Sequence, residues 1–107
     1  MSIRLEKPWQ ALERLDDLPG HLGVFQLGNA DGEVQFIGYA GGRSQYGLRS
    51  AIPDAVANVA TATSYRLEIT AAYLTRYQEL LMVHQADHGR LPSANDPVDN
   101  LGRLSPA

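Results

Sequence analysis

Glu79 is a candidate to hold a metal ion. Its next neighbours, Leu80 and Leu81, are apolar, and a carboxylate beside the edge of a sheet could accept a hard divalent cation. Arg76 offers a structural alternative, because residues three apart on a helix lie on one face and can form a surface ion pair. The residues alone leave both roles open for Glu79.

Two arginines could contact a phosphate group. Arg43 lies just before a predicted helix start, where it would form an anion-binding cradle with the backbone amides of Gly41, Gly42 and Ser44. Arg49 follows in the next short helix. The alternative for Arg43 is a flexible surface loop, and the alternative for Arg49 is an ordinary exposed arginine.

His84 and His88 have the i, i+4 spacing of paired zinc ligands. No third ligand is evident in the sequence. The favoured interpretation is therefore that His84 packs on the apolar stripe of a helix and that His88 is a cation at the helix end, where the dipole favours it. The sequence has no nucleophile motif and no nucleotide-binding glycine fingerprint. Hydrolysis through a covalent intermediate therefore has no support in the sequence.

Two short strands joined by a turn are expected to form the centre of the fold. Leu22–Leu27 and Val34–Tyr39 contain residues that favour extended backbone, and the turn at Gly28–Gly32 ends in the hairpin signal Asp31-Gly32. The strands carry the triplets Gly23-Val24-Phe25 and Phe36-Ile37-Gly38. Antiparallel pairing would bring together Gly23, Phe25, Phe36 and Gly38.

Short helices are predicted on both sides of this hairpin. Pro8–Leu15 has its apolar residues on one face, and Pro8 suits a first helical position. After the glycine-rich segment, Ser44 could cap a helix that includes Arg49. Pro53 disfavours helical backbone at the residue before it, which predicts a break there and a second helix over Pro53–Ala60.

A third strand and a long helix follow. Tyr65–Thr70 alternates with period two, and Leu67 and Ile69 are expected to anchor it. Ala71–His88 is the strongest helix signal, with Thr70 as its cap and Gly89 as its stop. Its predicted apolar stripe comprises Tyr73, Leu74, Tyr77, Leu80, Leu81 and His84.

These elements predict one α+β domain over residues 1–92, in which a small three-stranded antiparallel sheet is flanked by helices. Residues 93–107 are rich in proline, asparagine, aspartate and glycine, which is typical of a flexible tail. No apolar run approaches membrane-spanning length, and the N-terminus lacks the apolar core of a signal peptide. We therefore expect a cytoplasmic protein with no membrane partner.

The net charge of −3 argues against an extended nucleic-acid-binding surface, because affinity for nucleic acid comes largely from neutralising its phosphates. Nearly all of the positive charge is arginine, whose planar fork suits phosphate and also carboxylates. The charge balance therefore permits a local phosphate site and disfavours an extended one.

The order of the two triplets, Arg49 and Glu79 resembles that of the GIY-YIG nuclease domain, over roughly Trp9–Asn95. The resemblance implies a three-stranded antiparallel sheet between helices and an endonuclease that hydrolyses a phosphodiester bond of nucleic acid with one divalent cation, Mg²⁺ or Mn²⁺. By position it implies that Glu79 holds the metal and that Arg49 contacts the phosphate. Phe25 and Phe36 stand where the family has its two tyrosines.

Neither phenylalanine can donate or accept a proton, so the roles that the family assigns to its tyrosines fail at those positions. Tyr39 and Tyr46 are the candidates to bring a hydroxyl near the site instead. The first hypothesis is therefore a metal-dependent nuclease that uses Glu79 and either Arg49 or Arg43. The second is a catalytically silent member of the fold, which would bind nucleic acid or a protein partner, including a second copy of itself.

Overall fold

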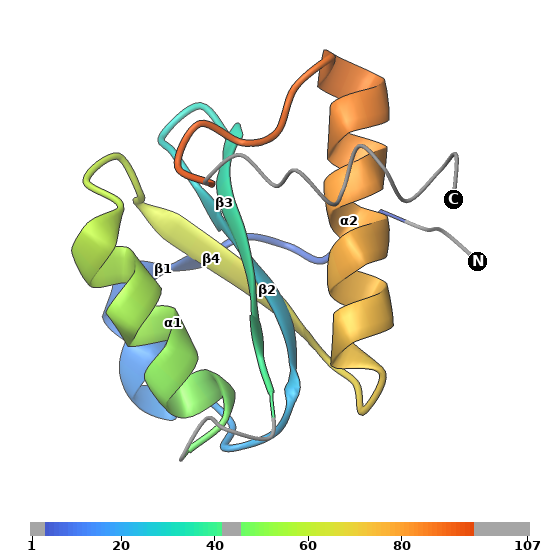
Figure 1. Ribbon diagram of the computed structural model, residues 1–107. Coiled ribbons are helices and arrows are strands. Elements are labelled where there is room, and N and C mark those ends of the chain that lie inside the picture. Colours follow the sequence, from blue (N-terminus) through green and yellow to red (C-terminus); the bar gives the residue numbers. More distant parts are fainter. Residues whose placement is uncertain (1–3, 42–45, 96–107) are drawn as a thin grey trace.

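The computed structural model describes residues 4–41 and 46–95. They form an α+β domain in which an antiparallel sheet with the strand order β1-β4-β2-β3 lies between helices (Figure 1). The elements in chain order are β1 (Gln10–Ala11), the 3-10 helix η1 (Leu12–Asp17), β2 (Gly23–Gly28), β3 (Val34–Ala40), α1 (Leu48–Asn58), β4 (Ser64–Ile69) and α2 (Tyr73–His88). The predicted α+β class is confirmed, and the sheet has four strands instead of three because β1 joins it.

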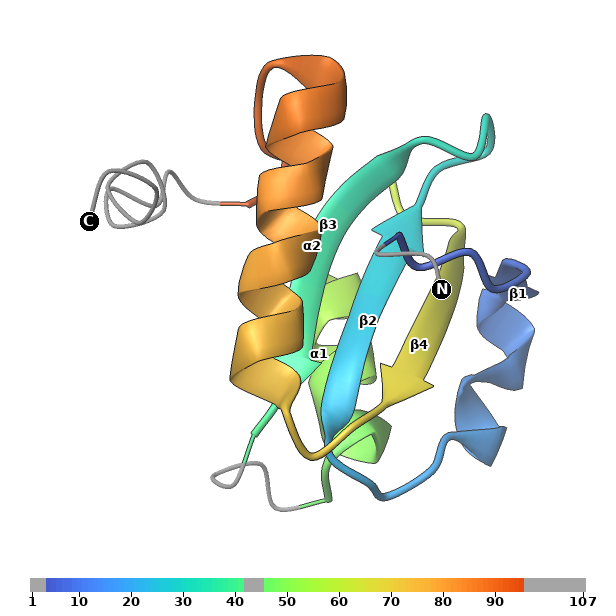
Figure 2. The same cartoon turned by 90° about the vertical axis from the view of Figure 1, so that its right-hand side faces the viewer.

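Helices α1 and α2 cover opposite faces of the sheet (Figures 1 and 2). Successive side chains of a strand point to opposite faces, so neighbouring residues of β2 belong to different cores. The buried core on the α1 side includes Phe25, Leu27, Ala40, Leu48, Ile52 and Tyr65. The buried core on the α2 side comprises Leu5, Val24, Ile37, Leu80 and Leu81.

Strands β2 and β3 form the predicted hairpin, in which Phe25 lies opposite Gly38. The turn between them is built as its residues suggest. Gly32 adopts a positive φ of 79°, and the Asn29 Oδ1 atom accepts hydrogen bonds from two backbone N–H groups of the turn, at 3.0 and 2.9 Å. Asparagine and glycine favour such turns because one bonds the local backbone and the other tolerates the left-handed region. The register of the two triplets is therefore fixed locally.

The helix predicted over Pro8–Leu15 is wrong in its first half, where β1 pairs with β4 and η1 begins only afterwards. Trp9 explains the difference. Its indole ring packs so closely on Gly28 that a Cβ atom there would lie 2.7 Å from it, and the Arg66 guanidinium lies 4.1 Å from the ring centroid. These contacts hold the segment extended along the sheet.

The break predicted before Pro53, with a second helix over Pro53–Ala60, is also wrong. Helix α1 is continuous from Leu48 to Asn58 and contains Pro53. Proline inside a helix cannot donate to the ladder and costs stability. Leu48 and Ile52 are both fully buried against the sheet, so core packing offsets that cost and keeps the helix in one piece.

The third predicted strand is confirmed as β4, but of its two expected anchors Leu67 is only half-buried and Ile69 is exposed. Tyr65 is the buried residue of the strand, and its hydroxyl donates a hydrogen bond to the Arg14 carbonyl at 3.1 Å. Ile69, at the end of the strand, is 54% exposed. The sequence pattern marked Ile69 as apolar but carried no signal of where the covering helices end.

The long helix is confirmed as α2, which begins at Tyr73, two residues later than predicted. Thr70 lies ahead of it, and its Oγ1 atom accepts a hydrogen bond from the Ala72 N–H at 3.1 Å. Gly89 ends the helix in the left-handed region, as expected. None of the helices in the described part of the chain has the length and apolar character needed to span a membrane.

Candidate functional site

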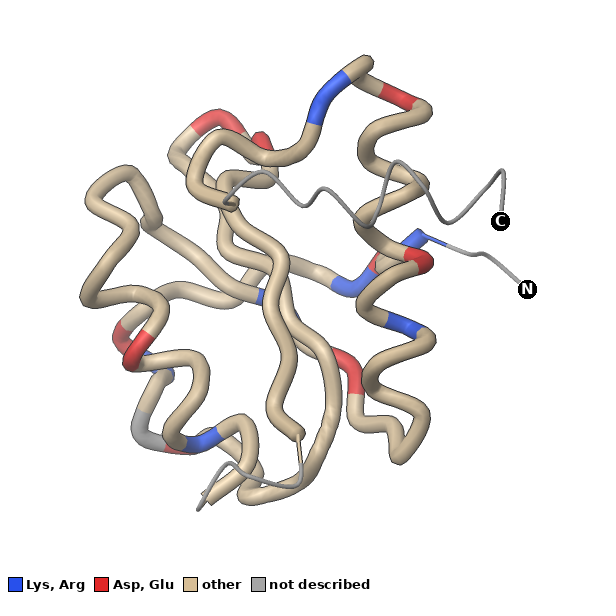
Figure 3. The backbone as a smooth tube through the Cα atoms, viewed as in Figure 1, with Lys and Arg blue, Asp and Glu red and all other residues tan. Residues whose placement is uncertain are grey.

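A groove of about 340 Å³ follows the edge of β3 and is lined by residues of both α1 and α2. Phe25 and Phe36 lie in it with their ring centroids 6.0 Å apart. Helix α1 contributes Ala51 and Ala55, and α2 contributes Tyr77. Within the described part of the chain no charged residue lines the groove, and β3 carries none (Figure 3). We call this surface the β3 groove.

The glycines of the two triplets, Gly23 and Gly38, are required by close packing. A Cβ atom on Gly38 would lie 2.5 Å from the Phe25 ring, and one on Gly23 would lie 2.2 Å from the Glu68 carbonyl oxygen. Distances below 3 Å are not tolerated by real Cβ atoms, so a larger residue at either position would displace its neighbours. The triplets therefore have a structural reason for their glycines that is independent of any chemistry.

Tyr39 reaches the β3 groove from the α2 face of the sheet, as part of a cluster of three tyrosines. Its ring stacks on Tyr73 with centroids 5.7 Å apart and meets Tyr77 edge-on at 4.8 Å. Burial, followed by the neighbouring Tyr39, raises the pKa of Tyr77. Tyr39 thus lines the β3 groove with its ring packed against two other tyrosines, and its catalytic role stays a prediction.

The last described residues of the chain cover part of the β3 edge. The Asn95 side-chain amide bonds both backbone groups of Ile37, accepting from its N–H and donating to its carbonyl at 2.9 Å each. The Ala94 N–H donates to the Gln35 carbonyl at 2.9 Å. Asn95 also lines the β3 groove. These contacts could not be predicted from the sequence, because a single asparagine in a loop-like stretch has no distinguishing pattern around it.

Arg49 does not enter the β3 groove. Its Nε atom donates a hydrogen bond to the Leu18 carbonyl at 3.1 Å, and its guanidinium carbon would lie 3.9 Å from a Cβ atom on Gly20. Arg49 therefore ties the start of α1 to the connection that leads into β2. Arg49 is not among the described residues that line the groove with Phe25 and Phe36, and the phosphate-contacting role that the resemblance implied for it stays a prediction.

Glu79 forms the ion pair that the sequence offered as its alternative role. Arg76 bonds both Glu79, three residues later on α2, and Glu68 on β4, the latter at 3.0 and 3.2 Å. Burial alone would lower the pKa of Arg76, but hydrogen bonds to Glu68 and Glu79 raise it. The Arg76 side chain is only 12% exposed, so it is a firmly held partner. The Glu79 carboxylate is thus ion-paired with Arg76, which it shares with Glu68.

The remaining predicted site residues are not gathered at the groove. Tyr46 is exposed, does not line the groove, and contacts Arg49 through its backbone carbonyl. Arg43 lies outside the described residues, as do Gly42 and Ser44 of its predicted anion cradle. Within residues 4–41 and 46–95, no three histidine, aspartate or glutamate side chains are grouped so that they could hold a metal ion. Mg²⁺ or Mn²⁺ binding at Glu79 stays a prediction.

Fold and groove together define a small α+β domain whose sheet lies between helices and whose open edge carries an apolar groove. Residues 3–87 match the family described as Domain of unknown function (DUF7508), and the chain belongs to that family. No curated protein matches the sequence.

Proposed function

We propose that this chain is a GIY-YIG-like domain that does not cut nucleic acid and instead binds a protein partner through the β3 groove. The observation that carries the proposal is the identity of the groove residues. Phe25, Phe36, Ala51 and Ala55 present only hydrocarbon. The polar groups beside them are the hydroxyls of Tyr39 and Tyr77 and the Asn95 amide, which is already bonded to β3.

Phosphodiester cleavage needs an activated water and positive charge near the developing phosphorane. Neither arginine nor lysine lines the groove among the described residues. Glu79 is engaged by Arg76, and Arg49 by the Leu18 carbonyl. The same lack of cations disfavours nucleic acid as the groove's ligand, because phosphate contacts supply most of that affinity.

An extended peptide with apolar side chains fits the chemistry of the groove. Ile37 uses its N–H and carbonyl to bond Asn95, so these groups point away from β2. In an antiparallel edge strand the backbone N–H and carbonyl of every second residue point away from the neighbouring strand. The N–H and carbonyl of Tyr39, two residues after Ile37, therefore point to the same open edge. A peptide could pair with that edge and insert side chains between Phe36 and Ala55, as peptides do when they add to a sheet.

Selection from a phage-displayed library of unstructured peptides tests the proposal. We expect enrichment of extended sequences with alternating apolar residues, and loss of their binding in Ala55→Glu, which places a charge in the groove. Ala57→Glu is the matched control, because Ala57 lies on the same helix, is exposed and does not line the groove. Failure to enrich any peptide, or equal loss in both variants, would contradict the proposal.

The metal-dependent endonuclease is the alternative that a cleavage assay separates from this proposal. Labelled single-stranded, duplex and branched DNA would be incubated with the protein and Mg²⁺ or Mn²⁺, with Glu79→Gln alongside. We expect no cleavage by either protein. Metal-dependent cleavage that disappears in Glu79→Gln would establish the enzyme and overturn the proposal.

A further inference from the structure

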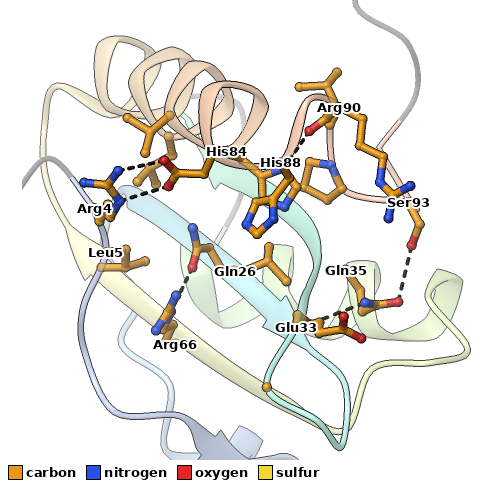
Figure 4. A pocket seen from close by; sticks show the side chains of 17 residues that line it. Arg4, Leu5, Gln26, Glu33, Gln35, Arg66, His84, His88, Arg90 and Ser93 are labelled. Carbon is orange, nitrogen blue, oxygen red and sulfur yellow. Dashed lines mark hydrogen bonds and ion pairs between the residues drawn. The ribbon is translucent and has the colours of Figure 1, made fainter.

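A second cavity, of about 420 Å³, lies on the α2 face of the sheet, and both basic and acidic side chains line it (Figure 4). Strands β2 and β4 contribute Gln26 and Arg66, and the end of α2 contributes His84 and His88. The N-terminal segment closes one side with Arg4. We call this cavity the α2 pocket. Its volume is in the range of small-molecule sites.

Gln26 is the most informative residue of the α2 pocket. It is the buried polar residue of β2, 5% exposed, and it faces an otherwise apolar core. Its Oε1 atom accepts a hydrogen bond from the Arg66 Nε atom at 2.8 Å. Within the described part of the chain, its Nε2 amide has no hydrogen-bond acceptor, and Figure 4 shows the side chain at the pocket wall. Among the described residues no buried side-chain nitrogen or oxygen atom lacks a hydrogen-bond partner, so this amide is open to the pocket, where it can donate a hydrogen bond to a ligand.

Arg66 is held rigidly beside Gln26. Its Nη1 atom donates to the Lys7 carbonyl at 3.3 Å, and its guanidinium stacks over Trp9 at 4.1 Å. Burial lowers the pKa of Arg66 and the nearby Glu6 opposes that shift, so the group stays a cation. A guanidinium fixed by packing loses little freedom when a ligand binds, which makes it an effective anchor for an anion.

The charges around the α2 pocket favour a negative ligand. Arg4 and Asp87 neutralise one another through two hydrogen bonds of 2.9 and 2.7 Å. The other charged lining residues of the described chain are two cations, Arg66 and Arg90, and one carboxylate, Glu33. This local excess of positive charge occurs in a protein whose net charge is −3, so it is a feature of the pocket and not of the surface as a whole.

Two histidines form part of the same wall. The His84 Nδ1 atom lies 2.8 Å from the Arg90 carbonyl. Since a carbonyl only accepts, Nδ1 carries the proton and the ring orientation is fixed. The His88 ring lies 4.4 Å from the His84 ring, centroid to centroid, and Figure 4 shows both rings directed into the pocket.

We propose that the α2 pocket binds a small molecule through an oxyanion, a carboxylate or a phosphate, that accepts hydrogen bonds from the Gln26 amide and the Arg66 guanidinium. The α2 pocket lies on the α2 face, whereas the β3 groove runs along the β3 edge, and no described residue lines both of them. The site is therefore separate from the proposed peptide groove, and each can fail without the other.

Nuclear magnetic resonance on the ¹⁵N-labelled wild-type protein tests this directly. Inorganic phosphate and succinate would be titrated separately, with ionic strength held constant by sodium chloride. We expect the side-chain amide signals of Gln26 to shift saturably with at least one of the two anions, and the anion that acts identifies the chemical class. Shifts absent for both anions, or linear and spread over the surface, would overturn the proposal.

Variants then test which residues bind. Gln26→Leu and Arg66→Gln should each weaken binding about tenfold or more, the usual effect of losing a hydrogen bond to a charged group. Arg14→Gln is the matched control, because it removes the same charge away from the pocket and should leave affinity unchanged. Binding that survives both pocket substitutions would mean an adventitious ion only. If either variant does not fold, the wild-type titration still decides.

Discussion

Replacing Gly38 by alanine should destabilise the protein, and the effect measures how tightly the two triplets pack. The added methyl group would lie 2.5 Å from the Phe25 ring and 2.8 Å from the Phe36 ring. Neither ring can retreat easily, because Phe25 is buried in the α1-side core and Phe36 packs against that core. Gly38 has no positive φ that would add strain of its own.

The expected magnitude follows from two opposing contributions. Forcing an extra methyl group into a packed core typically costs about 1–3 kcal/mol. Removing a glycine from the unfolded chain returns about 0.4–1 kcal/mol. The net loss in the free energy of unfolding should therefore be about 1–2 kcal/mol, which corresponds to a fall in the melting temperature of about 4 °C or more for a domain of this size.

Urea denaturation followed by circular dichroism measures this change, with Gly20→Ala as the control. A Cβ atom on Gly20 would meet its nearest neighbour at 3.6 Å, an ordinary contact, so that variant should be neutral. Phe25→Leu in the Gly38→Ala background should recover part of the loss, because it removes the ring that the methyl group strikes. A neutral Gly38→Ala variant would refute the reasoning and would mean that the two rings move freely in the groove.

Three further predictions follow from the same structure. Glu79→Gln should lower the free energy of unfolding by at most about 1 kcal/mol in urea denaturation, because its carboxylate is 42% exposed and Arg76 keeps Glu68; a loss of several kcal/mol would mean that the pair is a buried structural element. Leu80→Ala should cost about 2–5 kcal/mol and Leu74→Ala less than about 0.5 kcal/mol by the same method, since Leu80 is 2% and Leu74 51% exposed; similar costs would contradict the assigned face of α2. Burial lowers the pKa of His84 below its ordinary 6.5, so below that pH the unfolded chain binds more protons than the folded protein. This group should therefore leave the free energy of unfolding unchanged above pH 6.5 and lower it as the pH drops toward the folded-state pKa. A His84 pKa above 6.5, measured by proton NMR, would refute this prediction.

Much of the fold could be predicted because its signals are local. The β2–β3 hairpin depends on the turn chemistry of Asn29 and Gly32, and the end of α2 depends on Gly89, which needs only its own backbone conformation. The errors fall where distant contacts decide. Trp9 packs on Gly28 and Arg66 of the sheet, and Pro53 is retained in α1 by the burial of Leu48 and Ile52. Neither of these long-range contacts can be predicted from the residues adjacent in the sequence.

The candidate sites were harder to predict than the fold for a related reason. Sequence spacing identified Arg49 and Glu79 as charged residues near the triplets, but spacing does not say which way a side chain points. Arg49 turns to the Leu18 carbonyl and Glu79 to Arg76. Gln26 could not be identified as a site residue from the sequence, because one glutamine in an apolar strand is informative only when its burial and its partner Arg66 are known.

Strand β2 contributes one residue to each of the two proposed sites. Phe25 faces the β3 groove and Gln26, the next residue, faces the α2 pocket, because side chains alternate across a strand. Phe25 pairs with Gly38 and Leu67, and Gln26 pairs with Ile37 and Arg66, so the two residues share no cross-strand partner. Residues without shared partners usually contribute independently. Ala55→Glu should therefore abolish peptide binding without changing the response to phosphate or succinate, and Arg66→Gln should do the reverse. Loss of both activities in either variant would mean that the sheet transmits changes between its faces.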